Sequence, residues 1–289
     1  MTSTAEEIAA LGARTVVLEH GSRRVLVMDS ISFATVEDAG QVVVTGSHGG
    51  SSAGEYAAGV APAVVVCNDA GFGKGRAGVA GMAALDGLGV MALAVSHASA
   101  RIGDGMDSWR SGVISFANKT AIRGGFRLGD DLAPALARHL EQPATPPRTL
   151  QPSPRASAFR TVVHEAAGRR VVAMDSISFI TPEDRGQIVV AGSNGGMASG
   201  LVARQFQTAF VALNDAGIGK EEAGIAGLAA IDALAIAGVG ISNDSAAISD
   251  GRDTWENGVI SYANNSAHRL GFRLGARLKE SVLQALDSL

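Results

Sequence analysis

Three short polar strings in the first half of the chain carry side chains that could catalyse a reaction. The first holds Ser47 and His48, the second Asp69 and Lys74, and the third Ser99. A serine can attack a carbonyl carbon, a histidine or lysine can take the proton, and an aspartate can orient the base. The predicted catalytic residues are therefore Ser47, His48, Asp69, Lys74 and Ser99.

Neighbouring residues of the same strings, and their counterparts later in the chain, could hold a substrate. Arg101 can bind a carboxylate through two hydrogen bonds, and Asp104 can orient that guanidinium or a base. Glycines 49 and 50 could offer backbone N–H groups to an oxyanion. The predicted substrate-binding set is Gly49, Gly50, Asn68, Arg101, Asp104, Ser193, Asn194, Asn214, Lys220 and Ser245.

This combination of a nucleophile, a base, N–H groups and a cation predicts an enzyme. The favoured reaction is hydrolysis of a C–N (amide-type) bond in a small polar substrate that bears a carboxylate. One alternative is a non-covalent isomerase or lyase that transfers protons next to a carboxylate. Another is a regulatory module that binds a metabolite without turnover.

The polar strings occur twice. Residues 14–129 align without a gap with residues 160–275, at a constant offset of 146. The identities concentrate in polar or glycine-rich strings, such as Asn68–Lys74 against Asn214–Lys220. A duplicated core needs only matching apolar volume. The retained polar strings therefore indicate gene duplication of a site as well as of a fold.

The two copies differ where proton transfer and positive charge matter. Titratable or cationic residues of the first copy are replaced in the second: His48 by Asn194, His97 by Asn243, and Arg101 by Ala247. Asparagine keeps hydrogen bonding but loses the proton exchange near neutral pH that histidine provides. We therefore expect one working site, centred in the first copy and the inter-repeat interface, with a partly degenerate second copy.

Short apolar runs without alternation separate the polar strings, as is typical of strands buried on both faces of a parallel sheet. Predicted strands are 15–19, 24–28, 41–45, 63–67 and 91–95, and predicted helices are 52–58, 77–88 and 107–123. The first two strands lie close enough for a hairpin around Gly21 and Ser22. The predicted fold is α/β: two tandem homologous layered units, each a mostly parallel sheet with helices on both faces, related by pseudo-twofold symmetry.

Each polar string follows a predicted strand, and the carboxyl ends of parallel strands form the usual ligand crevice of such sheets. Prolines concentrate between the copies. We therefore divide the chain into a first repeat at 1–141, a proline-rich linker at 142–159 and a second repeat at 160–289.

Composition limits the partners and the compartment. The formal net charge of −4 over 289 residues argues against nucleic acid as a partner. No apolar run approaches the roughly 20 residues that cross a bilayer, and Glu6 and Glu7 stand where a secretory signal would be basic and then apolar. We expect a cytoplasmic protein with a small-molecule substrate and no membrane partner; a homo-oligomer is compatible with the sequence.

No cofactor is predicted. Nucleotide-binding glycine patterns are missing, and aromatic residues are only 4% of the chain, which argues against a large stacked cofactor. His48 and His97 with Asp69 or Asp104 could ligate zinc, iron or manganese, but their spacing matches no metal motif, so the predicted metal set is empty. Cys67 is the only cysteine and is interpreted as a buried strand residue.

Overall fold

The computed structural model describes residues 14–143, 159–166 and 168–289, which fall into two compact units. Unit 1 holds the described residues within Met1–Gly71, Ala77–Ala156 and Gly219–Glu221. Unit 2 holds those within Phe72–Arg76, Ser157–Ile218 and Glu222–Leu289. Each unit thus includes a short segment of the other repeat. Most of the predicted linker lies outside the described residues, and the predicted domain boundaries stay a prediction.

Unit 1 contains a six-stranded sheet whose strands follow one another in chain order. They are β1 (Thr15–His20), β2 (Arg23–Met28), β3 (Val42–His48), β4 (Val64–Asn68), β5 (Met91–Val95) and β6 (Ile114–Ala117). The four central strands are parallel, and the outer strands β1 and β6 are antiparallel to their neighbours. The predicted mostly parallel sheet is confirmed, and so is the hairpin, which turns at Gly21 and Ser22.

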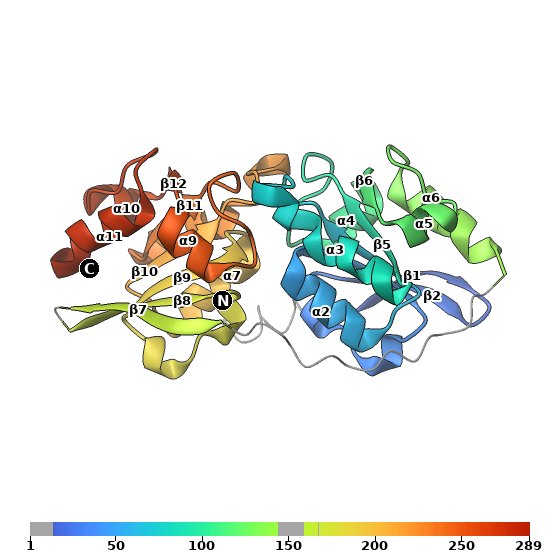
Figure 1. Ribbon diagram of the computed structural model, residues 1–289, viewed down its shortest axis with the longest axis horizontal. Coiled ribbons are helices and arrows are strands. Elements are labelled where there is room, and N and C mark those ends of the chain that lie inside the picture. Colours follow the sequence, from blue (N-terminus) through green and yellow to red (C-terminus); the bar gives the residue numbers. More distant parts are fainter. Residues whose placement is uncertain (1–13, 144–158, 167) are drawn as a thin grey trace. The chain divides into compact units, whose positions relative to one another are not determined.

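Helices cover both faces of this sheet (Figure 1). On one face lie α2 (Ser51–Val60) and α3 (Ala80–Ala84); on the other lie α4 (Gly105–Ser111), α5 (Lys119–Arg123) and α6 (Leu132–Glu141). Right-handed crossovers between successive parallel strands place α2 and α3 on the same face. Side chains alternate along each strand, so Val65 packs toward α2 and Val66 toward α6. Cys67 is fully buried, as predicted, and burial raises the pKa of its thiol to about 12.

Two of the predicted helices are wrong in part. Residues 107–123 contain the end of α4, the strand β6 and α5, because Gly112 ends α4 and residues 114–117 pair with β5. The glycine- and alanine-rich stretch 77–88 is α-helical only over α3 and continues as a 3₁₀ turn, Leu85–Leu88. Both errors arise where pairing or packing with distant residues overrides local helix preference.

Unit 2 repeats the layout. Its strands, again in sequential order, are β7 (Arg160–Ala166), β8 (Arg169–Met174), β9 (Ile188–Asn194), β10 (Phe210–Asn214), β11 (Ala237–Ile241) and β12 (Ile260–Ala263). Its helices are α7 (Met197–Phe206), α8 (Ala226–Ala230), α9 (Gly251–Asn257), α10 (Asn265–Arg269) and α11 (Leu278–Ala285). The similar layout of two α/β units is confirmed, whereas the pseudo-twofold axis stays a prediction. No helix in the described ranges is long and apolar enough to span a bilayer.

Candidate functional site

The carboxyl ends of β3, β4 and β5 bring three of the predicted polar strings together in unit 1. The strand register places His48 opposite Asn68, and Asn68 opposite Val95, two residues before His97. Neighbouring strands are about 4.8 Å apart. The strings therefore lie side by side. Gly46, Ser47 and His48 are the last three residues of β3 and not, as predicted, a loop that follows the strand.

Asp69 and His97 form a pair at these strand ends. Asp69 Oδ1 lies 2.9 Å from His97 Nδ1, and the same oxygen accepts hydrogen bonds from the backbone N–H groups of His97 and Gly71. Asp69 is only 1% exposed, whereas 31% of the His97 side chain is exposed. A buried carboxylate thus orients an imidazole that solvent can reach.

The protonation state of Asp69 suits this role. Burial acts to raise its pKa, but the hydrogen bonds from His97, Ser115 and the backbone outweigh burial and hold the pKa below its ordinary value. Asp69 is therefore ionised at neutral pH. A carboxylate at this position favours a proton on Nδ1, the tautomer in which the lone pair is on Nε2.

His97 is missing from the predicted catalytic set, although the sequence held a signal for it. The signal is the replacement of His97 by Asn243 in the second repeat. In unit 2 the Asn243 N–H donates to Asp215 Oδ1 at 3.0 Å, as the His97 N–H does to Asp69. The backbone arrangement is thus the same in both units, and at this position unit 1 has an imidazole where unit 2 has an amide.

His48 has a structural role that its counterpart shares. Its Nδ1 accepts a hydrogen bond from the Gly50 N–H at 3.1 Å, and Asn194 Oδ1 accepts one from the Gly196 N–H at 3.0 Å. Desolvation lowers the pKa of His48 to about 4, so the ring is neutral at pH 7, with its proton on Nε2. Replacing histidine with asparagine preserves the turn. The catalytic role of His48 stays a prediction.

The predicted nucleophiles have internal partners. Ser47 Oγ accepts a hydrogen bond from the Ile31 N–H at 3.0 Å. Ser99 Oγ donates to the carbonyl of the residue three positions earlier at 2.8 Å and accepts from the Val113 N–H at 2.9 Å. The corresponding bonds in unit 2 are made by Ser193 and Ser245. These contacts assign the serines to backbone support, and their predicted nucleophilic role stays untested.

The predicted amide and glycine groups also serve the fold. Asn68 is fully buried; its Nδ2 donates to the Ala100 carbonyl and its Oδ1 accepts from the Ala70 N–H, each at 2.9 Å. Asn214 makes the equivalent bonds in unit 2. The N–H groups of Gly49 and Gly50 donate to the Asn68 carbonyl and to His48. An oxyanion would have to compete with these bonds.

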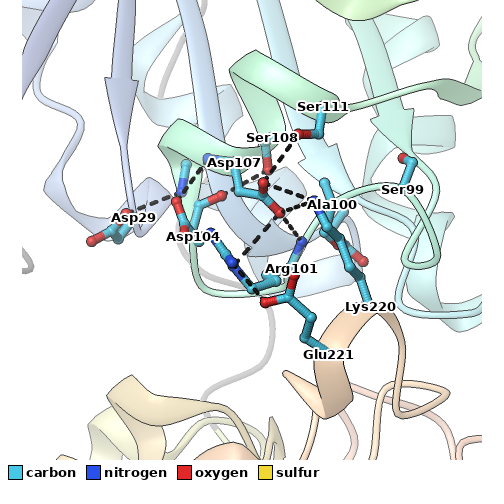
Figure 2. Close-up of polar contacts among 12 residues, drawn as sticks. Asp29, Ser99, Ala100, Arg101, Asp104, Asp107, Ser108, Ser111, Lys220 and Glu221 are labelled. Atoms are coloured by element: carbon cyan, nitrogen blue, oxygen red, sulfur yellow. Dashed lines mark hydrogen bonds and ion pairs between the residues drawn. The ribbon is translucent and has the colours of Figure 1, made fainter.

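A cluster of charged side chains surrounds Arg101 (Figure 2). Its guanidinium contacts Asp104 at 2.9 Å, Glu221 at 2.7 Å and Asp107 at 3.6 Å. Lys220 Nζ reaches both carboxylate oxygens of Asp107, at 2.9 and 3.0 Å, so Asp107 lies between the two cations. Gly219–Glu221 belongs to unit 1, so the whole cluster lies in that unit. We call these five residues the Arg101 cluster.

Two acidic residues of the Arg101 cluster also shape the start of α4. Asp104 is the N-cap of α4, and its Oδ1 accepts a hydrogen bond from the Asp107 N–H at 2.7 Å. Asp107 in turn accepts from the Arg101 N–H at 2.8 Å. Burial alone would raise the pKa of Asp107, yet the Arg101 N–H and Lys220 hold it below its ordinary value. Beside the cluster, burial raises the pKa of Asp29, which caps the Gly105 N–H.

Lys74 is the one predicted catalytic residue outside unit 1. It belongs to unit 2, where its Nζ contacts both carboxylate oxygens of Asp253 at 2.6 and 2.9 Å. This pair is the counterpart of Lys220 and Asp107. The predicted role of Lys74, to accept the proton of Ser47 or Ser99, therefore stays a prediction. In the structure Lys74 forms an ion pair with Asp253.

Fold and site together define a two-unit α/β protein whose first unit carries an oriented histidine and a charged cluster at its strand ends. No three His, Cys, Asp or Glu side chains come together as a metal site in the described part of the chain. No family model, curated protein or solved structure matches the chain.

Proposed function

We propose that this protein is an enzyme that transfers a proton at a small polar substrate bearing a carboxylate, with His97 as general base. The observation that carries the proposal is the 2.9 Å contact between His97 Nδ1 and the buried carboxylate of Asp69. A positioned base contributes about 10²- to 10⁴-fold to a rate. Arg101 is the group proposed to hold the carboxylate of the substrate.

The reaction we propose first is hydrolysis of a C–N (amide-type) bond with water as the nucleophile. His97 takes a proton from water while the water oxygen bonds to the carbonyl carbon and the C=O π pair moves onto the carbonyl oxygen. That pair re-forms the C=O bond as the C–N bond breaks, and His97 returns the proton to the leaving nitrogen, so the base is regenerated. Water replaces the predicted serine in this scheme because Ser47 and Ser99 already bond to the backbone.

An isomerase or lyase is the second candidate, and the same observation on the serines favours it. Proton removal from a carbon next to a carboxylate needs a base and a cation but no nucleophile. His97 would remove that proton, and Arg101 would bind the carboxylate. A binding module without turnover is the remaining alternative. Binding alone does not require a histidine that a buried carboxylate orients, so this alternative leaves the Asp69–His97 pair unexplained.

The test compares His97→Asn with a matched variant, Asn243→Ala. The purified full-length chain is offered a panel of small carboxylate-bearing amides, with amine release as the readout. Carboxylates in D₂O are followed in parallel by NMR for exchange of carbon-bound hydrogen. Amine release indicates hydrolysis, whereas exchange without release indicates an isomerase or lyase.

We expect His97→Asn to lower kcat by 100-fold or more with an unchanged fold, because asparagine occupies this position in unit 2. Asn243→Ala should change kcat by less than threefold. Asp69→Asn should also lower kcat, with Asp215→Asn as its control. Full activity of His97→Asn would contradict the proposal, and saturable binding without either reaction would favour the binding module.

A further inference from the structure

We propose that Gly219 and Lys220 are positioning residues that hold the base His97 in place. The inference rests on the proposed function above. Both residues come from the second repeat, yet Gly219–Glu221 belongs to unit 1 together with His97 and Asp69. The first repeat would thus need this segment of the second repeat for an accurately placed base.

The segment contacts the backbone of His97 directly. The Lys220 N–H donates a hydrogen bond to the His97 carbonyl at 2.8 Å. Asp69 accepts a hydrogen bond from the His97 N–H. His97 is therefore held on its N–H side by Asp69 and on its carbonyl side by Lys220, while Asp69 also fixes Nδ1 of its ring.

Only glycine fits at position 219. Its φ of +70° lies in the left-handed region, and a Cβ there would sit 2.9 Å from the His97 carbonyl oxygen and 3.4 Å from His97 Cβ. The first distance is shorter than real Cβ contacts allow. An alanine at 219 would push either the segment or His97 away from its present position.

A second anchor ties the same segment to the Arg101 cluster. Lys220 Nζ binds Asp107, and Asp107 accepts from the Arg101 N–H. One segment thus contacts both the proposed base and the residues that support the proposed carboxylate-binding guanidinium. Because displacements of about 1 Å in a site can cost about 100-fold in rate, this shared support is expected to matter for catalysis.

Backbone strain around the segment agrees with a held conformation. Ala216, Ile218 and Glu221 have φ values of 51°, 63° and 54°, in a region that side-chain-bearing residues rarely adopt. Such residues persist where surrounding contacts hold them. The Ala216 and Ile218 N–H groups donate to Asn214 Oδ1 and to the Asp215 carbonyl, and next to Glu221 the Lys220 N–H donates to the His97 carbonyl.

Unit 2 contains a matched segment beside an asparagine that cannot act as a base. Gly73 has a φ of +61°, and a Cβ there would lie 2.8 Å from the Asn243 carbonyl oxygen. The Lys74 N–H donates to the same carbonyl at 2.7 Å, and Lys74 Nζ binds Asp253. Substitution of Gly73, or of Asp253 that binds Lys74, therefore disturbs the matching contacts of unit 2 and leaves the contacts of His97 intact.

The experiment compares Gly219→Ala with Gly73→Ala in the full-length chain labelled with ¹⁵N-histidine. We expect both variants to lose similar thermal stability. Only Gly219→Ala should shift the NMR resonances and the pH midpoint of the His97 ring, and only it should lower kcat, by tenfold or more. Lys220→Met and Asp253→Asn, which breaks the ion pair of the Gly73 segment with Lys74, form a second pair with the same expected contrast, should an alanine variant fail to fold. Lys220→Arg should restore most of the loss, since it keeps the cation near Asp107.

The proposal is overturned if the His97 resonances and midpoint respond equally to the variants of both segments, or to neither. The NMR readout separates this result from a failure of the proposed function. If His97→Asn retains full activity, the enzyme proposal fails, while the ring titration still reports whether the segment holds His97. If His97→Asn is inactive and Gly219→Ala behaves like Gly73→Ala, the function stands and the positioning role falls.

Discussion

Arg101 and Glu221 form an ion pair at 2.7 Å, and both partners are missing together at the matching positions of unit 2, which hold Ala247 and Gly75. Because both residues of the ion pair differ between the repeats, the pair is one of the features that distinguish unit 1 from unit 2. It places a carboxylate of the protein on the guanidinium proposed to bind the carboxylate of the substrate. Glu221 would then compete with the substrate.

Arg101→Ala is expected to raise KM for a carboxylate-bearing substrate tenfold or more, and Glu221→Gln to lower it a few-fold. Arg101 is 38% exposed and Glu221 61%, so the pair contributes at most about 1 kcal/mol to the free energy of unfolding. Urea unfolding should therefore change little in either variant. Lys279→Met, which breaks an exposed ion pair with Glu256, serves as the control. An unchanged KM in Arg101→Ala would remove the carboxylate-binding role.

Ser99→Ala and Ser245→Ala are expected to destabilise the protein equally. Each hydroxyl bonds to one backbone carbonyl and one backbone N–H, so each loss should cost about 1–3 kcal/mol in urea unfolding. The kcat of Ser99→Ala should stay within a few-fold of the parent chain. Loss of turnover confined to Ser99→Ala would instead restore the serine nucleophile of the sequence analysis.

Acid is expected to destabilise the fold between pH 6.5 and about 4. Burial lowers the pKa of His48 and of His139 from 6.5 to about 4, so the unfolded chain binds these protons first. Their contribution to the free energy of unfolding is fully present above pH 6.5 and is lost as pH falls toward 4, by up to about 1.4 kcal/mol per pH unit for each group.

Urea unfolding of His48→Asn over this pH range checks the argument. Asparagine keeps the acceptor for the Gly50 N–H, as Asn194 does in unit 2. The variant should therefore lose part of the pH dependence without losing stability at pH 7.5. The same pH dependence in the variant and the parent chain would show that His48 titrates alike in the folded and unfolded states.

Gly81→Ala is expected to destabilise unit 1 by about 1–3 kcal/mol, because overpacking forces backbone shifts. A Cβ at Gly81 would lie 2.1 Å from the Gly50 carbonyl oxygen and 2.7 Å from the Gly54 nitrogen, where α3 meets α2. Gly87→Ala is the control, since nothing lies within 4 Å of a Cβ there. Equal urea midpoints for the two variants would show that α2 and α3 can separate at little cost.

The buried strands follow most directly from the sequence. Runs such as residues 63–67 and 91–95 are apolar throughout. Because a parallel sheet buries both faces of its central strands, continuous apolarity is enough to predict a strand at these positions. The predicted strands do not include β6, because its pairing partner β5 lies some twenty residues earlier and α4 and α5 flank it closely. Short edge strands carry little local signal of their own.

The sequence names residues such as Asp69, Arg101 and Lys220 as candidates but does not give the contacts among them. The register of the strand ends explains why the first polar strings lie together. The predicted catalytic set does not include His97, because a histidine becomes an oriented base only through a partner, here a carboxylate 28 residues earlier. Such pairing depends on the sheet and has no fixed sequence spacing.

By itself, the sequence determined that the chain is a duplicated α/β protein with polar strings at its strand ends, because apolar periodicity and internal identity are local properties. The tertiary structure alone decided that Lys220 contacts Asp107 and that Lys74 contacts Asp253. Those ion pairs join residues more than one hundred positions apart. Their physical cause is chain packing in three dimensions, where each lysine finds its carboxylate only after the strands and helices of a unit have come together.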